Sequence, residues 1–310
     1  SSVKTFLIFR ALRIVPALTA EITLSALILG PLVTSVALSA YFFDPTFARY
    51  FTNVVGIIRY QLPGVFLDNP LPGIVNGQLW TVPSELHCYI ALAVLMVVRL
   101  STKRHFMAAV LFILAVGESA TVLLPNHHYT ADVLNAPEML VLSFLCGNVF
   151  FLWKEKIPAS AWLFVASIGG YCFVTYLLPA AGFTLGIVSA TYFIVYLGTL
   201  RMPRIPVLMS GDYSYGIYLY SFPIQQAALW AAPSLRIWYI NLAIATPLTI
   251  LFAAASWHYL EKPALSLRKW LAPKAVLNKD TPRAAEKSAA SAQNPITESN
   301  RTTMPVSADR

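Results

Sequence analysis

Long apolar runs separated by short polar connections constrain this chain more than any other feature. A helix needs about 20 apolar residues to cross a bilayer, with a range of 17 to 25. Eight runs approach or reach that length: Ile14–Leu38, Leu79–Val98, Phe106–Leu124, Glu138–Trp153, Ala161–Leu178, Phe183–Leu200, Ser214–Ala231 and Trp238–Tyr259. Only 12% of all residues are charged, against about 25% in soluble domains. The sequence therefore predicts an all-α, polytopic transmembrane protein with eight spans.

Basic residues gather at alternate ends of these runs. One set of ends carries Lys4, Arg10, Arg13, Arg99, Lys103, Arg104, Lys154, Lys156, Arg201, Arg204, Lys262, Arg268 and Lys269. The other set carries only Arg49, Arg59 and Arg236. Because short loops rich in Lys and Arg stay in the cytoplasm, both termini of this chain are predicted to be cytoplasmic. Topology thus explains the net charge of +8 better than a nucleic-acid partner does.

Two segments lie outside the spans. Residues 39–78 form a long outer-side loop whose prolines and apolar residues predict a piece folded onto the membrane surface. From about residue 272 the composition shifts to Lys, Ala, Ser, Thr, Asn and Pro without periodicity, which is typical of disorder. Residues 1–271 are therefore predicted to form the transmembrane domain, and residues 272–310 a disordered cytoplasmic tail.

Metal chemistry has no support in the sequence. Cys88, Cys146 and Cys172 lie singly inside apolar runs, without CxxC or paired-histidine spacing. We interpret them as small buried hydrophobes, and we predict no metal site.

A glutamate enters the membrane where a polar loop turns into an apolar helix. Glu85 follows Trp80 by five residues, and an ionisable group at that depth is costly unless it is paired or used. On a helix Glu85 and Tyr89 share a face, whereas His87 points elsewhere. Glu85 can act as a base, hold a histidine of another helix, or be a satisfied interfacial carboxylate.

An arginine pair opens the first span. Arg10 and Arg13 are three residues apart, so they lie on one face of a helix and can fork around a phosphate. The alternative is a simple positive anchor at the cytoplasmic surface.

Two further polar segments border the last two spans. Asp212 or Ser214 can cap the seventh span and leave free N–H groups that favour an anion, although the neighbouring tyrosines are equally typical of an aromatic belt. At the end of the eighth span, Glu261 and Lys262 resemble an ordinary membrane exit, with Pro263 ending the helix.

Two acids lie deeper in the predicted spans. Glu21 follows Arg13 by eight residues, and Glu118 follows Arg104 by fourteen. Intramembrane acids are functional hypotheses by default, and structural pairing with an arginine is the alternative.

Together these segments, in this order, resemble membrane acyltransferase family 3, which includes bacterial O-antigen and exopolysaccharide O-acetyltransferases. The resemblance covers roughly residues 4–265. The matching residues are Arg10, Arg13 and Pro16, the L-W-[ST]-[LV]-x-x-E signature at Leu79–Glu85, Ser214–Leu219, and Glu261–Lys262–Pro263. The signature that ends at Glu85 is the most specific of the four.

The resemblance implies a ten-helix enzyme in the bacterial inner membrane that transfers an acyl group from cytoplasmic acyl-CoA, acetyl-CoA above all, to a carbohydrate hydroxyl. The implied partners are the lipid bilayer, the carbohydrate acceptor and polysaccharide biosynthesis machinery. Arg10 and Arg13 correspond to donor-binding residues and Glu85 to a catalytic residue across the membrane from them. The remaining motif residues are implied to bind substrate or support the motifs: Trp80, Ser214, Tyr215, Tyr218 and Glu261.

The sequence departs from the family in one respect. The resemblance implies an essential histidine on a first helix that would lie upstream of Ser1, and none of the five histidines fits that position. Ser221 also stands where many relatives have histidine. We therefore expect two N-terminal helices to be missing and residues 1–310 alone to be inactive. A flippase for a lipid-linked sugar, or an inactive accessory subunit of polysaccharide assembly, is the alternative.

Overall fold

The computed structural model describes residues 2–123, 137–178, 182–200, 211–233 and 236–271. Within these ranges the ordered elements are helical, apart from an isolated antiparallel bridge between Thr34 and Val65. The α-helices are α1 (Val3–Leu24), α2 (Gly30–Val33), α3 (Leu38–Phe43), α4 (Pro45–Tyr50), α5 (Thr81–Val97), α6 (Arg104–Leu123), α7 (Pro137–Trp153), α8 (Ala161–Leu177), α9 (Gly182–Thr199), α11 (Ser214–Ala231), α12 (Trp238–Ser256), α13 (Lys262–Ser266) and α14 (Arg268–Leu271). The all-α prediction is confirmed.

Several helices have the length and apolar character of membrane spans. Three are long enough by both measures, namely Val3–Val33, Gly77–Val97 and Trp238–Leu271, and shorter apolar helices lie at Glu138–Trp153, Ala161–Leu177 and Thr184–Thr199. These helices fit a multi-pass membrane protein. The exact number of eight spans remains a prediction.

The first helix is longer than the hydropathy pattern predicts. It begins at Val3, where the Ser2 hydroxyl accepts a hydrogen bond from the backbone N–H of Thr5. It continues through a π-helical turn to Val33. The predicted start at Ile14 was wrong because the basic residues before it, which hydropathy penalises, are themselves helical. Arg10 therefore lies inside the helix.

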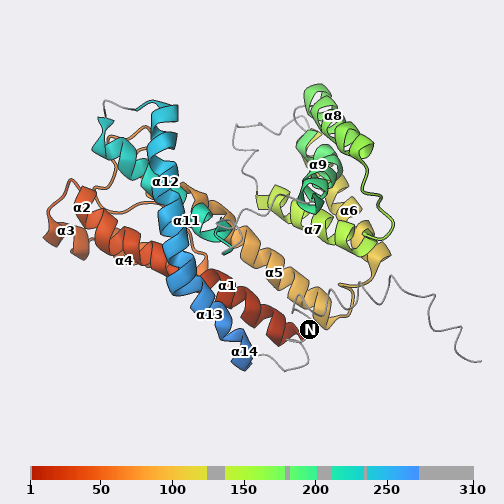
Figure 1. Cartoon of the computed structure of the whole chain (residues 1–310), viewed down its shortest axis with the longest axis horizontal. Helices are drawn as coiled ribbons and strands as arrows, with labels where there is room; N and C mark the ends of the chain where they lie inside the picture. Colours follow the sequence, from red (N-terminus) through yellow and green to blue (C-terminus); the bar gives the residue numbers. More distant parts are fainter. Residues whose placement is uncertain (1, 124–136, 179–181, 201–210, 234–235, 272–310) are drawn as a thin grey trace, which may run out of the picture.

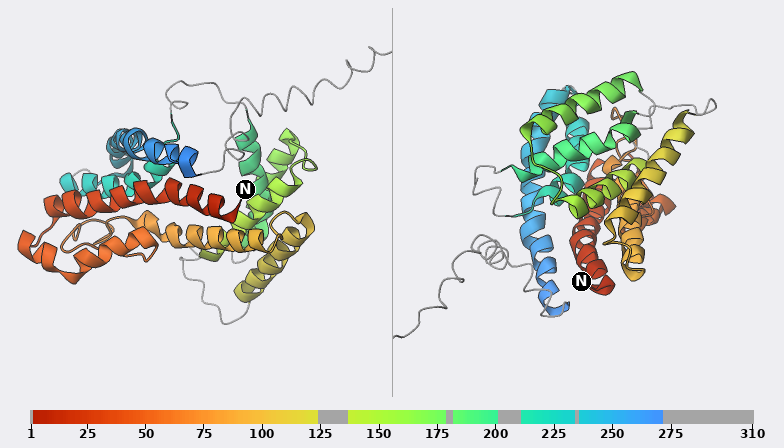
Figure 2. Two further views of the ribbon diagram at one scale, coloured as in Figure 1. Left: turned by 90° about the horizontal axis from the view of Figure 1, so that it is seen from below. Right: turned by 90° about the vertical axis from the view of Figure 1, so that its right-hand side faces the viewer.

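The helices form two groups (Figure 1). The first helix, α11 and the helix from α12 to α14 make one group, and α6 to α9 make the other. Helix α5 contacts both α1 and α7, so it connects the two groups. In the view from below, α1 and α5 run alongside each other (Figure 2). The larger apolar core belongs to the first group, where α1 supplies Ile14, Leu18 and Ile22.

The long loop of residues 39–78 is folded against the first group. The Tyr41 hydroxyl donates to the Ala26 carbonyl at 2.7 Å. From α11, the Gln226 side-chain amide donates to the carbonyls of Leu71 and Ile74 at 2.9 and 2.7 Å, and the Asn69 amide donates to the Gln226 carbonyl at 2.8 Å. Because these groups are buried, their hydrogen bonds fix the loop to α11.

The last helix does not end at Pro263. A π-helical turn, Trp257–Glu261, is followed directly by α13, in which the proline occupies the first turn. Pro263 lies where the π-helical turn passes into α13, and the helix continues through it to Leu271. The predicted tail, residues 272–310, and the predicted cytoplasmic Arg201 and Arg204 lie outside the described residues.

Candidate functional site

The first helix carries two arginines with different surroundings. Arg10 is exposed, and its guanidinium lies over the rings of Tyr89 and Phe6, at 4.9 and 5.6 Å from their centroids. Within the described ranges Arg10 forms no ion pair. A guanidinium that stacks on aromatic faces keeps its N–H groups available to an anion.

Arg13 is paired instead. Its Nη2 lies 2.8 Å from Oδ2 of Asp212, just before α11. Partial burial raises the pKa of the Asp212 carboxyl, but the hydrogen bond from Ser214 and the charge of Arg13 outweigh burial and hold that pKa below its usual range. Asp212 therefore remains ionised at neutral pH, and the pair connects the first helix to α11.

Glu85 and Arg10 belong to one connected group. Glu85 is half-buried in the first turn of α5, and the hydroxyl of Tyr89, one turn later, donates to Glu85 Oε1. The ring of Tyr89 also stacks on the Arg10 guanidinium, so Tyr89 contacts both Glu85 and Arg10. The prediction that Glu85 lies across the membrane from the arginines was therefore wrong. It treated the arginines as the mouth of a span, whereas Arg10 is two turns inside a helix that packs along α5.

The tyrosines of α11 point into the protein. Tyr218 donates to the Gln78 carbonyl and shares a hydrogen bond with the Thr81 hydroxyl. Tyr215 stacks on Tyr218 and donates to the Ile14 carbonyl of the first helix at 3.3 Å. The interpretation as an aromatic belt was wrong for Tyr215 and Tyr218, because both hydroxyls form hydrogen bonds inside the protein.

Neither Asp212 nor Ser214 is the N-cap of α11, although the sequence suggested that either could cap this helix. Tyr213 occupies the N-cap position without a side-chain cap. The Ser214 hydroxyl donates to Asp212 Oδ1 at 2.7 Å, and Asp212 is already bound to Arg13. Ser221, on the next turn but one, exchanges hydrogen bonds with the Gln78 side chain at 2.9 and 3.2 Å.

Glu261 is a buried residue rather than part of an ordinary membrane exit. It is 1% exposed, and its Oε1 accepts a hydrogen bond from the Ser256 hydroxyl at 3.1 Å across the π-helical turn. This turn and α13 pack against α1. The fourth motif therefore supports the helix that carries the arginines.

All four sequence motifs thus meet around the first helix. The sequence paired Glu85 with Tyr89 by spacing, and the structure confirms that they share a face. The hydrogen bonds of Gln78 to α11 were not predicted, although Gln78 lies in the polar stretch before Trp80. Trp80 itself is partly buried. His87 is exposed on α5, and His258 contacts Tyr213.

Metal ligands are not grouped in the part of the chain that the structure covers. Within the described ranges no three His, Cys, Asp or Glu side chains come together as a metal site. Cys88 and Cys146 are buried, as predicted, but Cys172 is exposed on α8. A thiol within a membrane span can face lipid as well as a protein core, which is compatible with the exposed position of Cys172.

Comparisons with known proteins give one family match and two relatives. A family model described as an acyltransferase domain matches residues 1–260. Nodulation protein 10 of Rhizobium leguminosarum bv. viciae is 26% identical over 301 residues, which cover 86% of this chain and 77% of that protein. The O-acetyl transferase of Shigella phage Sf6 is 25% identical over 269 residues, covering 84% and 77% respectively. No solved structure matches the chain.

Proposed function

This chain belongs to the acyltransferase family matched above and is an acyltransferase; on that premise we propose that it transfers an acetyl group from acetyl-CoA to a hydroxyl of a cell-surface or exported carbohydrate. The acetyl group is favoured because one relative is an O-acetyl transferase. We place the enzyme in the bacterial inner membrane, with the donor on the cytoplasmic side, where the basic ends of the spans lie.

One observation carries the proposal: an accessible cation and a half-buried carboxylate, Arg10 and Glu85, are joined through Tyr89. The donor carries phosphates, which a guanidinium binds with short, charge-assisted hydrogen bonds. Of the two arginines on the first helix, Arg10 is the exposed one, so it makes the first contact with phosphate. Arg13, held by Asp212, adds positive charge and fixes the helix beside α11.

In the acyl-transfer step, Glu85 acts as the base. The oxygen of the acceptor hydroxyl forms a bond to the acyl carbon, the bond from that carbon to the thioester sulfur breaks, and the thiolate leaves with the electron pair. The hydroxyl proton passes to the Glu85 carboxylate. The Tyr89 hydrogen bond holds this carboxylate in place through Oε1, which leaves Oε2 for the acceptor.

The test is direct transfer of label. Membranes that contain the full-length protein are incubated with acetyl-labelled acetyl-CoA and the carbohydrate of the producing strain. We expect label in the carbohydrate that mild alkali releases as acetate, because an ester is formed. Carbohydrate that moves across the membrane without acquiring label would instead support a transporter and would contradict the proposal.

A further inference from the structure

A proline in α11 leaves one carbonyl of that helix without its usual donor. Pro223 lies inside α11, and a proline has no N–H to give to the carbonyl four residues earlier. In this helix that carbonyl belongs to Leu219, a residue without exposed surface. A buried carbonyl without a hydrogen bond is costly, so a donor from outside α11 is needed to satisfy it.

The donor comes from the turn that leads into α5. Asn76 is also fully buried, and its Nδ2 donates to the Leu219 carbonyl at 2.9 Å. Its Oδ1 accepts a hydrogen bond from the backbone N–H of Gln78 at 3.2 Å. Asn76 therefore caps the 3-10 helical turn Gly77–Trp80, which passes directly into α5. One side chain thus joins the beginning of that helix to α11.

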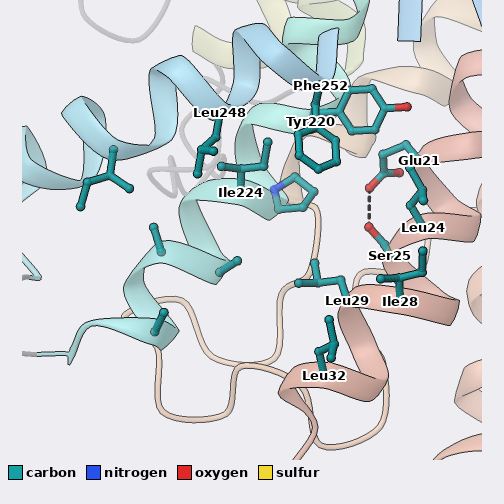
Figure 3. Close-up of a pocket in the computed structure, with 15 residues that line it drawn as sticks. Glu21, Leu24, Ser25, Ile28, Leu29, Leu32, Tyr220, Ile224, Leu248 and Phe252 are labelled. Atoms are coloured by element: carbon teal, nitrogen blue, oxygen red, sulfur yellow. Dashed lines mark hydrogen bonds between the residues drawn. The ribbon is translucent and has the colours of Figure 1, made fainter. Parts of the chain in front are cut away.

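The same side chain reaches the first helix. Glu21 is 1% exposed, and its Oε1 accepts a hydrogen bond from Ser25 at 2.8 Å, while the amide of Asn76 is a further hydrogen-bonding neighbour. Figure 3 shows Glu21 and Ser25 on the first helix, near Tyr220 of α11. The alternative that Glu21 pairs with an arginine is not what the structure shows within the described ranges. Asn76 thus contacts each of the helices that carry the candidate site.

The two residues after this asparagine show how closely the turn fits α11. A Cβ atom on Gly77 would lie 2.9 Å from the ring of Phe222, so only glycine allows this approach. The side chain of Gln78 exchanges hydrogen bonds with Ser221, and its carbonyl accepts one from Tyr218. Three consecutive residues therefore fix the start of α5 against α11.

We propose that Asn76 is a positioning residue for acyl transfer, which sets the place of Glu85 relative to α11 and the first helix. Gly77–Val97 is one continuous helix, so its first turn determines where Glu85, about two turns later, lies. An amide is required here, because it offers N–H donors to a carbonyl and a carboxylate and an oxygen to a backbone N–H. The proposal rests on the proposed function through the role of Glu85 as base.

Kinetics of the full-length protein separate positioning from stability. Asn76→Ala should lower kcat for acetyl transfer by about 10- to 100-fold, because a small displacement of a catalytic group has an effect of that size. The KM for acetyl-CoA should change little, since Arg10 lies on another helix. Asn241→Ala is the matched control: this asparagine also donates to a carbonyl of α11, that of Gln225 at 3.0 Å, but from α12. It should leave kcat unchanged.

A second substitution keeps the test informative if Asn76→Ala destabilises the protein. Pro223→Ala supplies the missing N–H, so in the double variant the Leu219 carbonyl is satisfied within α11 and the melting temperature should recover. The start of α5 still lacks its anchor, so kcat should stay low. Recovery of kcat together with the melting temperature would show that Asn76 only stabilises the fold and would overturn the proposal.

A distance measurement tests the position itself, independently of activity. Spin labels on His87→Cys of α5 and Ile217→Cys of α11, both exposed positions, report the spacing of the two helices in nanodiscs when exposed Cys172 is replaced by serine. We expect a narrow distance distribution with Asn76 present, including in Asn241→Ala, and a shifted or broadened one in Asn76→Ala. An unchanged distribution in Asn76→Ala would overturn the proposal. The expected distances in a protein that transfers no acetyl group would instead contradict the proposed function.

Discussion

Replacing Arg10 by alanine is expected to lower kcat/KM for the acyl-CoA donor by about 10- to 100-fold. A hydrogen bond to a charged group contributes about 1.5–3 kcal/mol, and each 1.4 kcal/mol corresponds to tenfold. The effect should appear mainly as a higher KM, because the guanidinium contacts phosphate in the ground state as well as in the transition state. Initial rates at varied acetyl-CoA concentration, measured on membranes with equal amounts of protein, give both constants.

Arg49 supplies the matched control for this substitution. It is exposed on α4, in the loop of residues 39–78, so Arg49→Ala should leave both constants unchanged. Arg10→Lys should recover only part of the loss, because an ammonium cannot make the paired contacts of a guanidinium or stack as well on Tyr89. Donor kinetics that are unchanged in Arg10→Ala would remove Arg10 from the donor site.

Replacing Glu85 by glutamine is expected to lower kcat by about 10²- to 10⁴-fold, the usual contribution of a positioned general base. Glutamine has nearly the same shape and can still accept the Tyr89 hydrogen bond, so the fold and membrane insertion should be retained. The KM for the donor should change little, since Arg10 remains stacked on Tyr89. Single-turnover acyl transfer at saturating donor measures the chemical step.

The control for Glu85 is another Glu→Gln change. Glu155 is exposed in the connection after α7, and Glu155→Gln should have the activity of the unaltered enzyme. If Glu85→Gln is equally active, Glu85 has a structural role as the partner of Tyr89 and the base must be sought elsewhere.

The helices of this protein are largely predictable from sequence. Apolar runs mark their positions because a bilayer solvent demands long uninterrupted apolar helices. Their ends are less predictable. The first helix includes Arg10 and Arg13, whose charges hydropathy penalises, because Arg10 stacks on Tyr89 and Arg13 pairs with Asp212. The last helix continues past Pro263 because a π-helical turn precedes the proline.

The sequence suggested candidate residues for the site but not their arrangement. Spacing suggested Arg10 and Glu85 and correctly placed Tyr89 on the face of Glu85, and the family resemblance added Tyr215 and Glu261. Spacing within one helix cannot show which helices are neighbours, so the sequence separated Arg10 from Glu85. The histidine and the additional helices implied by the family resemblance remain predictions.

The central claim is that Arg10 and Glu85 act in one site connected by Tyr89, and a double-mutant cycle tests it most directly. The kcat/KM for acetyl transfer is measured for the unaltered protein, Arg10→Ala, Glu85→Gln and the double variant. Groups in contact through a shared partner show interaction energies of about 0.5–3 kcal/mol. We therefore predict that the double variant loses about tenfold less activity than the product of the two single losses. Losses that multiply without any coupling would contradict the account and place the two residues in independent sites.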